Sequence, residues 1–235
     1  MHVMRTYSVG VVGLVGVLGA GCAGTGPGGG AEASHRAPAA NVTAAQATAR
    51  LVEGNLRFAQ GHPEHPRQTP DRRAELAGSQ APFAVVIGCA DSRTGPEVIF
   101  DQGLGDLFVI RVAGNVVDDH ALGSVEYAVD HLHTGMIVVL GHERCGAVGA
   151  AREVAGAHGH AEGHIESLVG AIRPAVDATA GQDAEATCRA NVRNVVRALR
   201  GSEPILRPLA ESGRIAVVGA YYDLDTGVVT FLKDE

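Results

Sequence analysis

The 235-residue sequence has no tryptophan, and eighteen of its nineteen basic residues are arginine because Lys233 is the only lysine. Basic residues are outnumbered by 26 acidic ones, and the formal net charge at pH 7 is -7. Nucleic-acid-binding proteins need a cationic face, so this balance argues against a nucleic-acid partner. No apolar run is long enough to span a bilayer. A content of 46% hydrophobic and 19% charged residues is typical of a globular protein with a substantial core.

The amino terminus has the pattern of a bacterial export signal. Arg5 lies in a short leading segment, and the apolar residues 9–20 that follow have the length of a secretory signal core, too short to span a bilayer. This stretch ends in Leu18-Gly19-Ala20-Gly21-Cys22, which resembles a lipoprotein cleavage box whose cysteine becomes lipidated. We therefore expect residues 1–22 to be a lipoprotein-type signal peptide with Cys22 as the lipidation site.

The alternative is an ordinary signal peptide cut further along, for instance after Ala33, which would give a soluble secreted protein. In both cases we expect export, to the periplasm or the cell envelope. Residues 23–40 are rich in Gly, Ala and Pro and have almost no aliphatic side chains, so they predict a flexible linker. The folded domain is expected to span 41–235.

Beyond residue 41 the apolar pattern switches between helix and strand. Residues 43–60 have helical spacing, with Thr43 as a plausible N-cap and Gly61 as a stop signal. Short, continuously apolar runs rich in β-branched residues predict buried strands over 84–88, 107–112, 136–141 and 215–219. Helical stretches at 119–131 and 190–199 would supply crossovers between parallel strands, and 228–232 an edge strand.

The predicted fold class is therefore α/β, with about four parallel strands plus an edge strand in one sheet flanked by helices. No Gly-x-Gly-x-x-Gly motif or P-loop follows the first strand, so the phosphate cradle of nucleotide-binding proteins is missing. Open α/β sheets bind ligands at the carboxyl ends of their strands. The residues after the first and third strands are thus the candidates for chemistry.

Four side chains able to bind a metal ion follow these two strands. Cys89 and Asp91 come after the first strand, while His142 and Cys145 follow the third. Two thiolates, an imidazole and a carboxylate form a set that zinc accepts in a tetrahedron. Each short spacing alone arises often by chance, but two of them at adjacent strand ends are a much stronger signal.

Other interpretations of these residues remain open from spacing alone. Cys89 and Cys145 can be buried core thiols or, in an oxidising compartment, a disulfide pair. A zinc ion held by all four side chains can also be purely structural. Arg93 argues against a structural ion, because a guanidinium two residues beyond Asp91 can pair with this carboxylate and draw it off the metal, which leaves a position for water.

The same residues carry a family resemblance. The segments Cys89-Ala90-Asp91-Ser92-Arg93 and His142-Glu143-Arg144-Cys145-Gly146 resemble the paired signature of the β-class carbonic anhydrases. Residues 105–115 and 124–128 resemble that family's intervening blocks, so the similarity covers most of 43–232. The resemblance implies a Rossmann-like domain whose N-terminal helical arm embraces a partner, in a homodimer or an assembly of dimers.

The resemblance also implies a reaction and its metal. The expected activity is the zinc-dependent, reversible hydration of carbon dioxide to bicarbonate and a proton, with one Zn²⁺ per chain. Cys89, His142 and Cys145 match the permanent zinc ligands of the family. Asp91 and Arg93 match its switchable pair, in which Asp91 is a fourth ligand when it is on the metal and a catalytic proton acceptor when Arg93 holds it off.

Substrate contacts are implied in the same way. Gln80 matches a glutamine that donates a hydrogen bond to a substrate oxygen, and Ala113 lies where the substrate would be held. Phe108 and Tyr127 match aromatic lining positions that are contributed across the dimer interface. Val112 departs from the family, which usually has Asn at that position.

Two functions of other classes are alternatives. One is a catalytically silent zinc module that serves as a binding scaffold, although a scaffold would have no need of Asp91, Arg93 and Gln80 together. The other is a related hydrolase that acts on carbon disulfide or carbonyl sulfide at the same kind of zinc site. The shape of the access tunnel would distinguish such a hydrolase.

Further histidines and one more cysteine have simpler interpretations. A Gly- and Ala-rich stretch contains His158, His160 and His164, and no cysteine or carboxylate pattern completes a second metal site there. We expect a solvated loop. Cys188 falls in a predicted helix and is expected to be a small buried hydrophobic residue rather than a reactive thiol.

Overall fold

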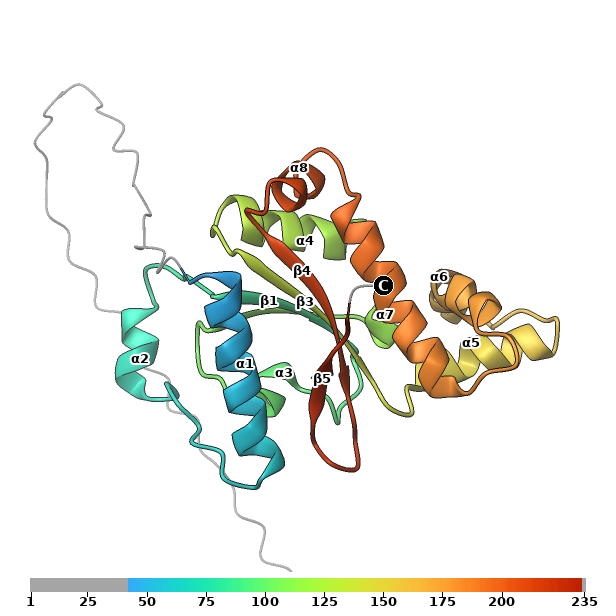
Figure 1. Cartoon of the computed structure of the whole chain (residues 1–235), viewed down its shortest axis with the longest axis horizontal. Helices are drawn as coiled ribbons and strands as arrows, with labels where there is room; N and C mark the ends of the chain where they lie inside the picture. Colours follow the sequence, from blue (N-terminus) through green and yellow to red (C-terminus); the bar gives the residue numbers. More distant parts are fainter. Residues whose placement is uncertain (1–41, 234–235) are drawn as a thin grey trace, which may run out of the picture. The chain divides into compact units, whose positions relative to one another are not determined.

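The computed structural model describes residues 42–233, so the predicted signal peptide, Cys22 and the linker lie outside the described residues. The described chain forms one sheet with the order β2-β1-β3-β4-β5 (Figure 1). Its strands are β1 (Ala84–Gly88), β2 (Leu107–Arg111), β3 (Met136–His142), β4 (Ala216–Tyr222) and β5 (Val229–Phe231). The first four are parallel and β5 is antiparallel to β4, which confirms the predicted α/β class and the edge strand.

Two helices precede β1, and the other helices lie in the connections between the parallel strands. The helices are α1 (Ala44–Ala59), α2 (Pro70–Glu75), α3 (Pro96–Ile99), α4 (Asp119–Asp130), α5 (Gly146–Gly156), α6 (Ile165–Ala178), α7 (Ala184–Arg200) and α8 (Leu206–Glu211), with a 3₁₀ turn at Ala113–Asn115. The predicted helix 43–60 is confirmed as α1, and Thr43 caps it in a reciprocal capping box with Gln46. The predicted helix 190–199 is longer in the structure, because Asp183 accepts a hydrogen bond from the Ala186 N–H and starts α7 earlier.

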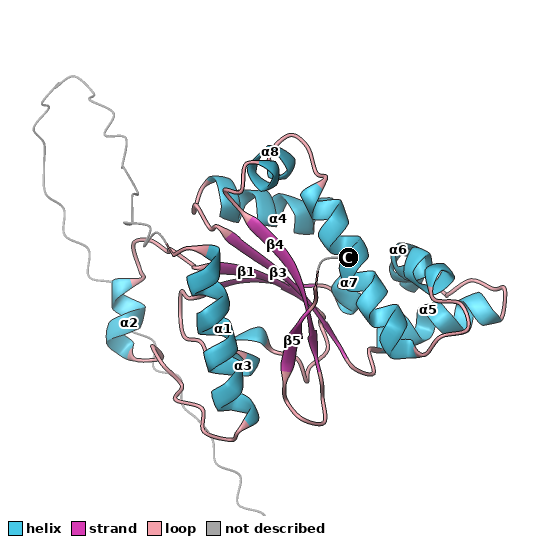
Figure 2. Ribbon diagram, in the orientation of Figure 1, coloured by secondary structure: helices cyan, strands magenta, loops and turns pink. Residues whose placement is uncertain are grey.

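The sheet buries both faces, as its continuously apolar strands predict. Figure 2 shows the strands between helices on either side. Val85 and Ile87 of β1 pack in a core with α4, α7 and α8, while Ala84 and Val86 point to the opposite face and pack with α1 and α3. This alternation follows from the two-residue period of a strand.

Strand order decides where the donor residues meet. β1 lies between β2 and β3, and Gly88 at the end of β1 pairs with Leu140 near the end of β3. Cys89 and His142 therefore emerge from neighbouring strands at the same edge of the sheet, as predicted. None of the helices within residues 42–233 is long and apolar enough to cross a membrane.

Candidate active site

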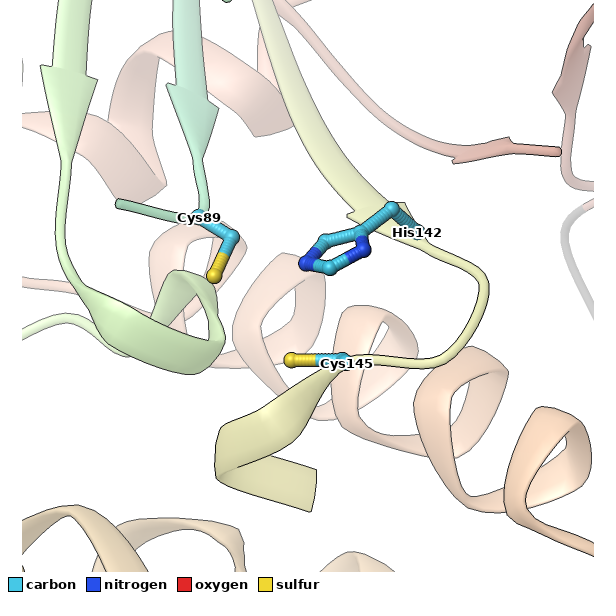
Figure 3. Close-up of side chains that lie close together, drawn as sticks. All are labelled: Cys89, His142 and Cys145. Carbon is cyan, nitrogen blue, oxygen red and sulfur yellow. The ribbon is translucent and has the colours of Figure 1, made fainter. Parts of the chain in front are cut away.

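Three of the four predicted metal donors form one buried group. One donor atom each from Cys89, His142 and Cys145 lies within 4.8 Å of the other two, and all three residues are buried. Figure 3 shows both sulfur atoms and the imidazole ring pointing toward one another. Cys89 follows β1, His142 ends β3, and Cys145 is the N-cap of α5, so the sheet and one helix together position the group.

His142 presents the nitrogen that a metal requires. Its Nδ1 lies 2.8 Å from the carbonyl oxygen of Glu143, and because a carbonyl only accepts, Nδ1 carries the proton. Nε2 is then the lone-pair nitrogen, and this buried atom has no hydrogen-bond partner. A histidine ligand is commonly fixed in this way, with its second nitrogen donating to a carbonyl. The orphaned Nε2 thus fits a metal ligand.

The contact between the two thiols shifts their pKa values in opposite directions. A hydrogen bond from the Cys145 thiol, together with His142 and the backbone N–H groups of Asp91 and Gly114, lowers the pKa of the Cys89 thiol. The bond to Cys89 and burial raise the pKa of Cys145. Both cysteines are free thiols, so the disulfide alternative is not what the structure has.

The fourth predicted donor, Asp91, is paired with Arg93. Arg93 Nε lies 2.9 Å from Asp91 Oδ1, and Nη2 lies 2.7 Å from Oδ2. These bonds hold the pKa of the Asp91 carboxyl well below its usual range. Because the guanidinium occupies both carboxylate oxygens, Asp91 is paired with Arg93 and is not part of the group of three.

Two residues outside the predicted site support this loop. Arg111, at the end of β2, donates from Nε to the Cys89 carbonyl at 2.9 Å and from Nη2 to the Asp91 carbonyl at 2.5 Å. The buried Thr94 hydroxyl donates to the Asp91 carbonyl at 3.0 Å. The sequence signal that could have identified Arg111 is a charged residue at the end of an apolar strand. Thr94 had no comparable signal, because only the folded loop brings its hydroxyl to that carbonyl.

The backbone of the 3₁₀ turn also contacts the sulfur of Cys89. Gly114 N–H donates to Cys89 Sγ at 3.2 Å, and the adjacent Ala113 is half-buried beside this contact. Gly114 has φ +70, and a Cβ there would approach Ile172 at 2.7 Å, so this position suits glycine. Ala113, a predicted substrate contact, is therefore next to the metal group.

The other predicted substrate residues lie elsewhere in the same chain. Gln80 precedes the start of β1, whereas Cys89 follows its end, and five residues at about 3.3 Å each separate the strand ends by roughly 15 Å. Phe108 pairs with Val85 near the start of β2 and β1. Tyr127 on α4 has its ring centroid 6.4 Å from that of Phe108. One chain does not bring these three side chains to the metal group.

The remaining histidines and cysteine behave as expected from their surroundings. His158, His160 and His164 lie in the exposed loop between α5 and α6, and the residues that the structure describes form no second metal-binding group there. Cys188 on α7 is buried, and burial raises the pKa of its thiol to about 11, as suits an unreactive core cysteine.

The place of these donors defines the class of protein, namely α/β proteins that bind a soft metal ion where parallel strands end. Comparison with known proteins then identifies the family. A family model described as carbonic anhydrase matches residues 84–229, which include the four parallel strands and both donor loops. The chain belongs to the β-carbonic anhydrase family, and it is by that membership a lyase.

Two mycobacterial relatives match over most of their length. Carbonic anhydrase 2 of Mycobacterium tuberculosis strain H37Rv is 43% identical over 192 residues, which cover 80% of this chain and 92% of the relative. The carbonic anhydrase of Mycolicibacterium smegmatis is 41% identical over 182 residues, which cover 76% and 88% respectively.

Solved structures give the same fold. One similar structure is from a pair of tetrameric β-carbonic anhydrases of the ascomycete Sordaria macrospora, with a TM-score of 0.63, 27% identity, and coverage of 77% of this chain and 94% of that one. The Coccomyxa β-carbonic anhydrase in complex with acetazolamide has a TM-score of 0.61 and 31% identity, covering 77% and 84%.

Proposed function

We propose that this protein catalyses the zinc-dependent, reversible hydration of carbon dioxide to bicarbonate and a proton. The observation that carries this proposal is the buried, unpartnered Nε2 of His142, which faces two cysteine sulfurs. Buried polar atoms are rarely left without a partner, and a nitrogen lone pair with two soft thiols suits zinc.

Cys89, His142 and Cys145 would hold one zinc ion per chain. When bound, the ion lowers the pKa of a water at its open position from about 15.7 toward about 7, which supplies a nucleophile near neutral pH. Two thiolates donate more electron density than two imidazoles, so this ionisation is expected at higher pH than in a site of three histidines.

Asp91 would act as the proton acceptor beside that position. Arg93 holds both of its oxygens and donates its own backbone N–H to Oδ1 at 3.0 Å, so the carboxylate is kept ionised and oriented. A carboxylate fixed in this way can accept a hydrogen bond from the proton of the nucleophile, and so orient its lone pair, without reorganising, which is the advantage of preorganised charge. Ala113 would contribute to the surface that holds carbon dioxide.

A homodimer, or an assembly of dimers, would complete the substrate site. Gln80, Phe108 and Tyr127 lie away from the metal group of their own chain, so a second subunit is needed for them to contact substrate there. The 47% exposure of Tyr127 leaves its ring available for such a contact. From the partner, Gln80 would donate to the carbon dioxide oxygen as negative charge develops on it.

Metal analysis and a stopped-flow assay of carbon dioxide hydration test the proposal together. We expect about one zinc per chain, as in a four-coordinate zinc site, and rapid hydration. Zinc without hydration would favour the silent scaffold, and hydrolysis of carbon disulfide in place of hydration would favour the related hydrolase. Absence of zinc from the fully folded protein would refute the metal assignment.

For the location of the protein we propose export with a lipid anchor at Cys22, on the strength of the sequence pattern alone. Cys22→Ala is expected to move the protein from the membrane fraction to the soluble fraction with unchanged hydration activity, because the linker separates the anchor from the domain. A wild-type protein that is soluble and begins beyond residue 30 would instead indicate ordinary secretion.

A further inference from the structure

An ion pair joins the metal-donor loop to the turn that follows β4. Arg144 lies between His142 and Cys145, and its Nη2 is 2.6 Å from Asp225 Oδ1 while its Nη1 is 2.9 Å from Oδ2. The same Nη1 lies 2.9 Å from Glu143 Oε1. The bidentate contact fixes orientation as well as distance.

The backbone of Arg144 connects this pair to the catalytic loop. Its carbonyl oxygen accepts a hydrogen bond from Arg93 Nη2 at 3.3 Å, the same nitrogen that contacts Asp91. Arg144 also has φ +50, in the left-handed region that non-glycine residues adopt at a cost. A residue in that conformation persists only where its surroundings hold it. The side-chain contacts of Arg144 supply such support.

The turn that carries Asp225 is itself fixed. The Asp223 carboxylate accepts hydrogen bonds from the N–H groups of Asp225 and Thr226 at 3.0 and 2.8 Å. On the other side, the buried Asn55 of α1 donates to the Gly227 carbonyl and accepts from Val229 N–H, both at 2.8 Å. Asp225 is thus presented by a turn that is anchored to the N-terminal helix.

A second set of contacts runs parallel to the ion pair. Glu143 N–H donates to the Tyr222 carbonyl at 2.9 Å, and Glu143 Oε2 accepts from Leu224 N–H at 3.1 Å. Loss of the ion pair alone therefore leaves the loop attached through Glu143, while the Arg144 side chain loses its bidentate contact with Asp225.

We propose that Asp225 is a positioning residue for the reaction, acting through Arg144 on the Arg93 guanidinium. The Arg93 guanidinium donates hydrogen bonds to two acceptors, the Asp91 carboxylate and the Arg144 carbonyl. The Arg144 carbonyl stays in position because Asp225 holds the Arg144 side chain. The role in the reaction rests on the proposed function. The role in ordering the donor loop does not.

A loss of fold is not expected when the pair is broken. The side chains of Arg144 and Asp225 are 51% and 69% exposed, and ion pairs with that exposure contribute little to global stability. Asp225→Asn keeps the size of the side chain and removes its charge. Asp177→Asn is the matched control, since it breaks the Arg173–Asp177 ion pair on α6. In that pair Arg173 Nε lies 2.9 Å from Asp177 Oδ1, and the two side chains are 42% and 63% exposed.

Hydrogen exchange measured by mass spectrometry tests the positioning independently of activity. In the zinc-loaded full chain, Asp225→Asn is expected to speed exchange several-fold in peptides that cover 142–148, with no change in those that cover α6. Asp177→Asn is expected to leave 142–148 unchanged. Wild-type exchange rates at 142–148 in Asp225→Asn would overturn the proposal.

A double-mutant cycle tests the route through Arg93. Asp225→Asn alone is expected to lower kcat/KM for hydration about five- to tenfold, near the lower end of effects from residues outside the ligand set. In an Arg93→Ala background it should cause no further loss, because the side chain through which it acts is gone. Equal losses in both backgrounds would refute this route. If the wild type is inactive, the proposed function fails, and hydrogen exchange alone then decides whether Asp225 orders the loop.

Discussion

Arg93 contacts Asp91 with both ends of its guanidinium fork, at 2.9 Å from Nε to Oδ1 and 2.7 Å from Nη2 to Oδ2. A closed structural cage would have the Asp91 carboxylate on the metal as its fourth ligand. In this structure the carboxylate faces the guanidinium, and the group of donors that lie together is limited to Cys89, His142 and Cys145 among the described residues. The pair therefore favours a site with room for water.

Removal of the guanidinium tests this interpretation. Arg93→Ala is expected to retain its zinc and to lose about 10- to 100-fold in kcat/KM, because the freed carboxylate can bind the metal and close the open position. Zinc content and hydration kinetics of the same preparations check it. Arg173→Ala, which removes an exposed arginine from an ion pair on α6, is the control. Undiminished turnover in Arg93→Ala would contradict the switch and leave the ligand assignment intact.

The pH dependence follows from the same pair. Hydrogen bonds from Arg93 keep the pKa of Asp91 below its ordinary value of 3.8, so the ion pair stabilises the fold above that pH and loses this effect only as pH falls through the lowered pKa. Asp91 thus stays ionised between pH 6 and 9. Hydration is nevertheless expected to rise with pH, through ionisation of the water that zinc activates. Measurement of kcat/KM over about pH 6 to 9 checks this, and a flat profile would be inconsistent with it.

Replacement of a ligand separates the metal site from the rest of the core. Cys145→Ser is expected to lose most of the bound zinc and with it the activity, because one of two soft ligands is gone and metal binding also supports the folded state. Zinc per chain is measured after dialysis. Cys188→Ala is the control, since Cys188 is a buried thiol outside the donor group and its loss should leave zinc in place. A Cys145→Ser protein with full zinc would rule out this ligand.

Packing between α1 and the residues after α3 depends on a glycine. A Cβ at Gly54 would lie 1.8 Å from the carbonyl oxygen of Phe100, so Gly54→Ala is expected to destabilise the protein by about 1–3 kcal/mol through overpacking. Gly170→Ala on α6 meets nothing within 4 Å and is expected to stabilise it by roughly 0.5–1 kcal/mol. Urea midpoints at one protein concentration compare the variants. Equal midpoints for both would contradict the predicted close approach.

The sequence predicts the first helix and strand of the domain better than the helices between β3 and β4. β1 was predicted at its observed bounds, and α1 lies between its predicted cap residues, because continuous apolar runs and a local capping box act over a few residues. Helices α5 and α6 were not predicted. Their segments are rich in Gly and Ala, and they are stabilised by packing against each other and against α7, which a local pattern does not reveal.

For this protein the sequence by itself determined the kinds of donor, their spacing after two strands and the family to which the chain belongs. Only the tertiary structure decided that Asp91 faces Arg93, that His142 turns Nε2 toward the sulfurs, and that Gln80 lies away from the metal group. The reason is that distances between residues far apart in the chain depend on strand order and register. In this sheet, β1 and β3 are neighbours although β2 comes between them in the sequence.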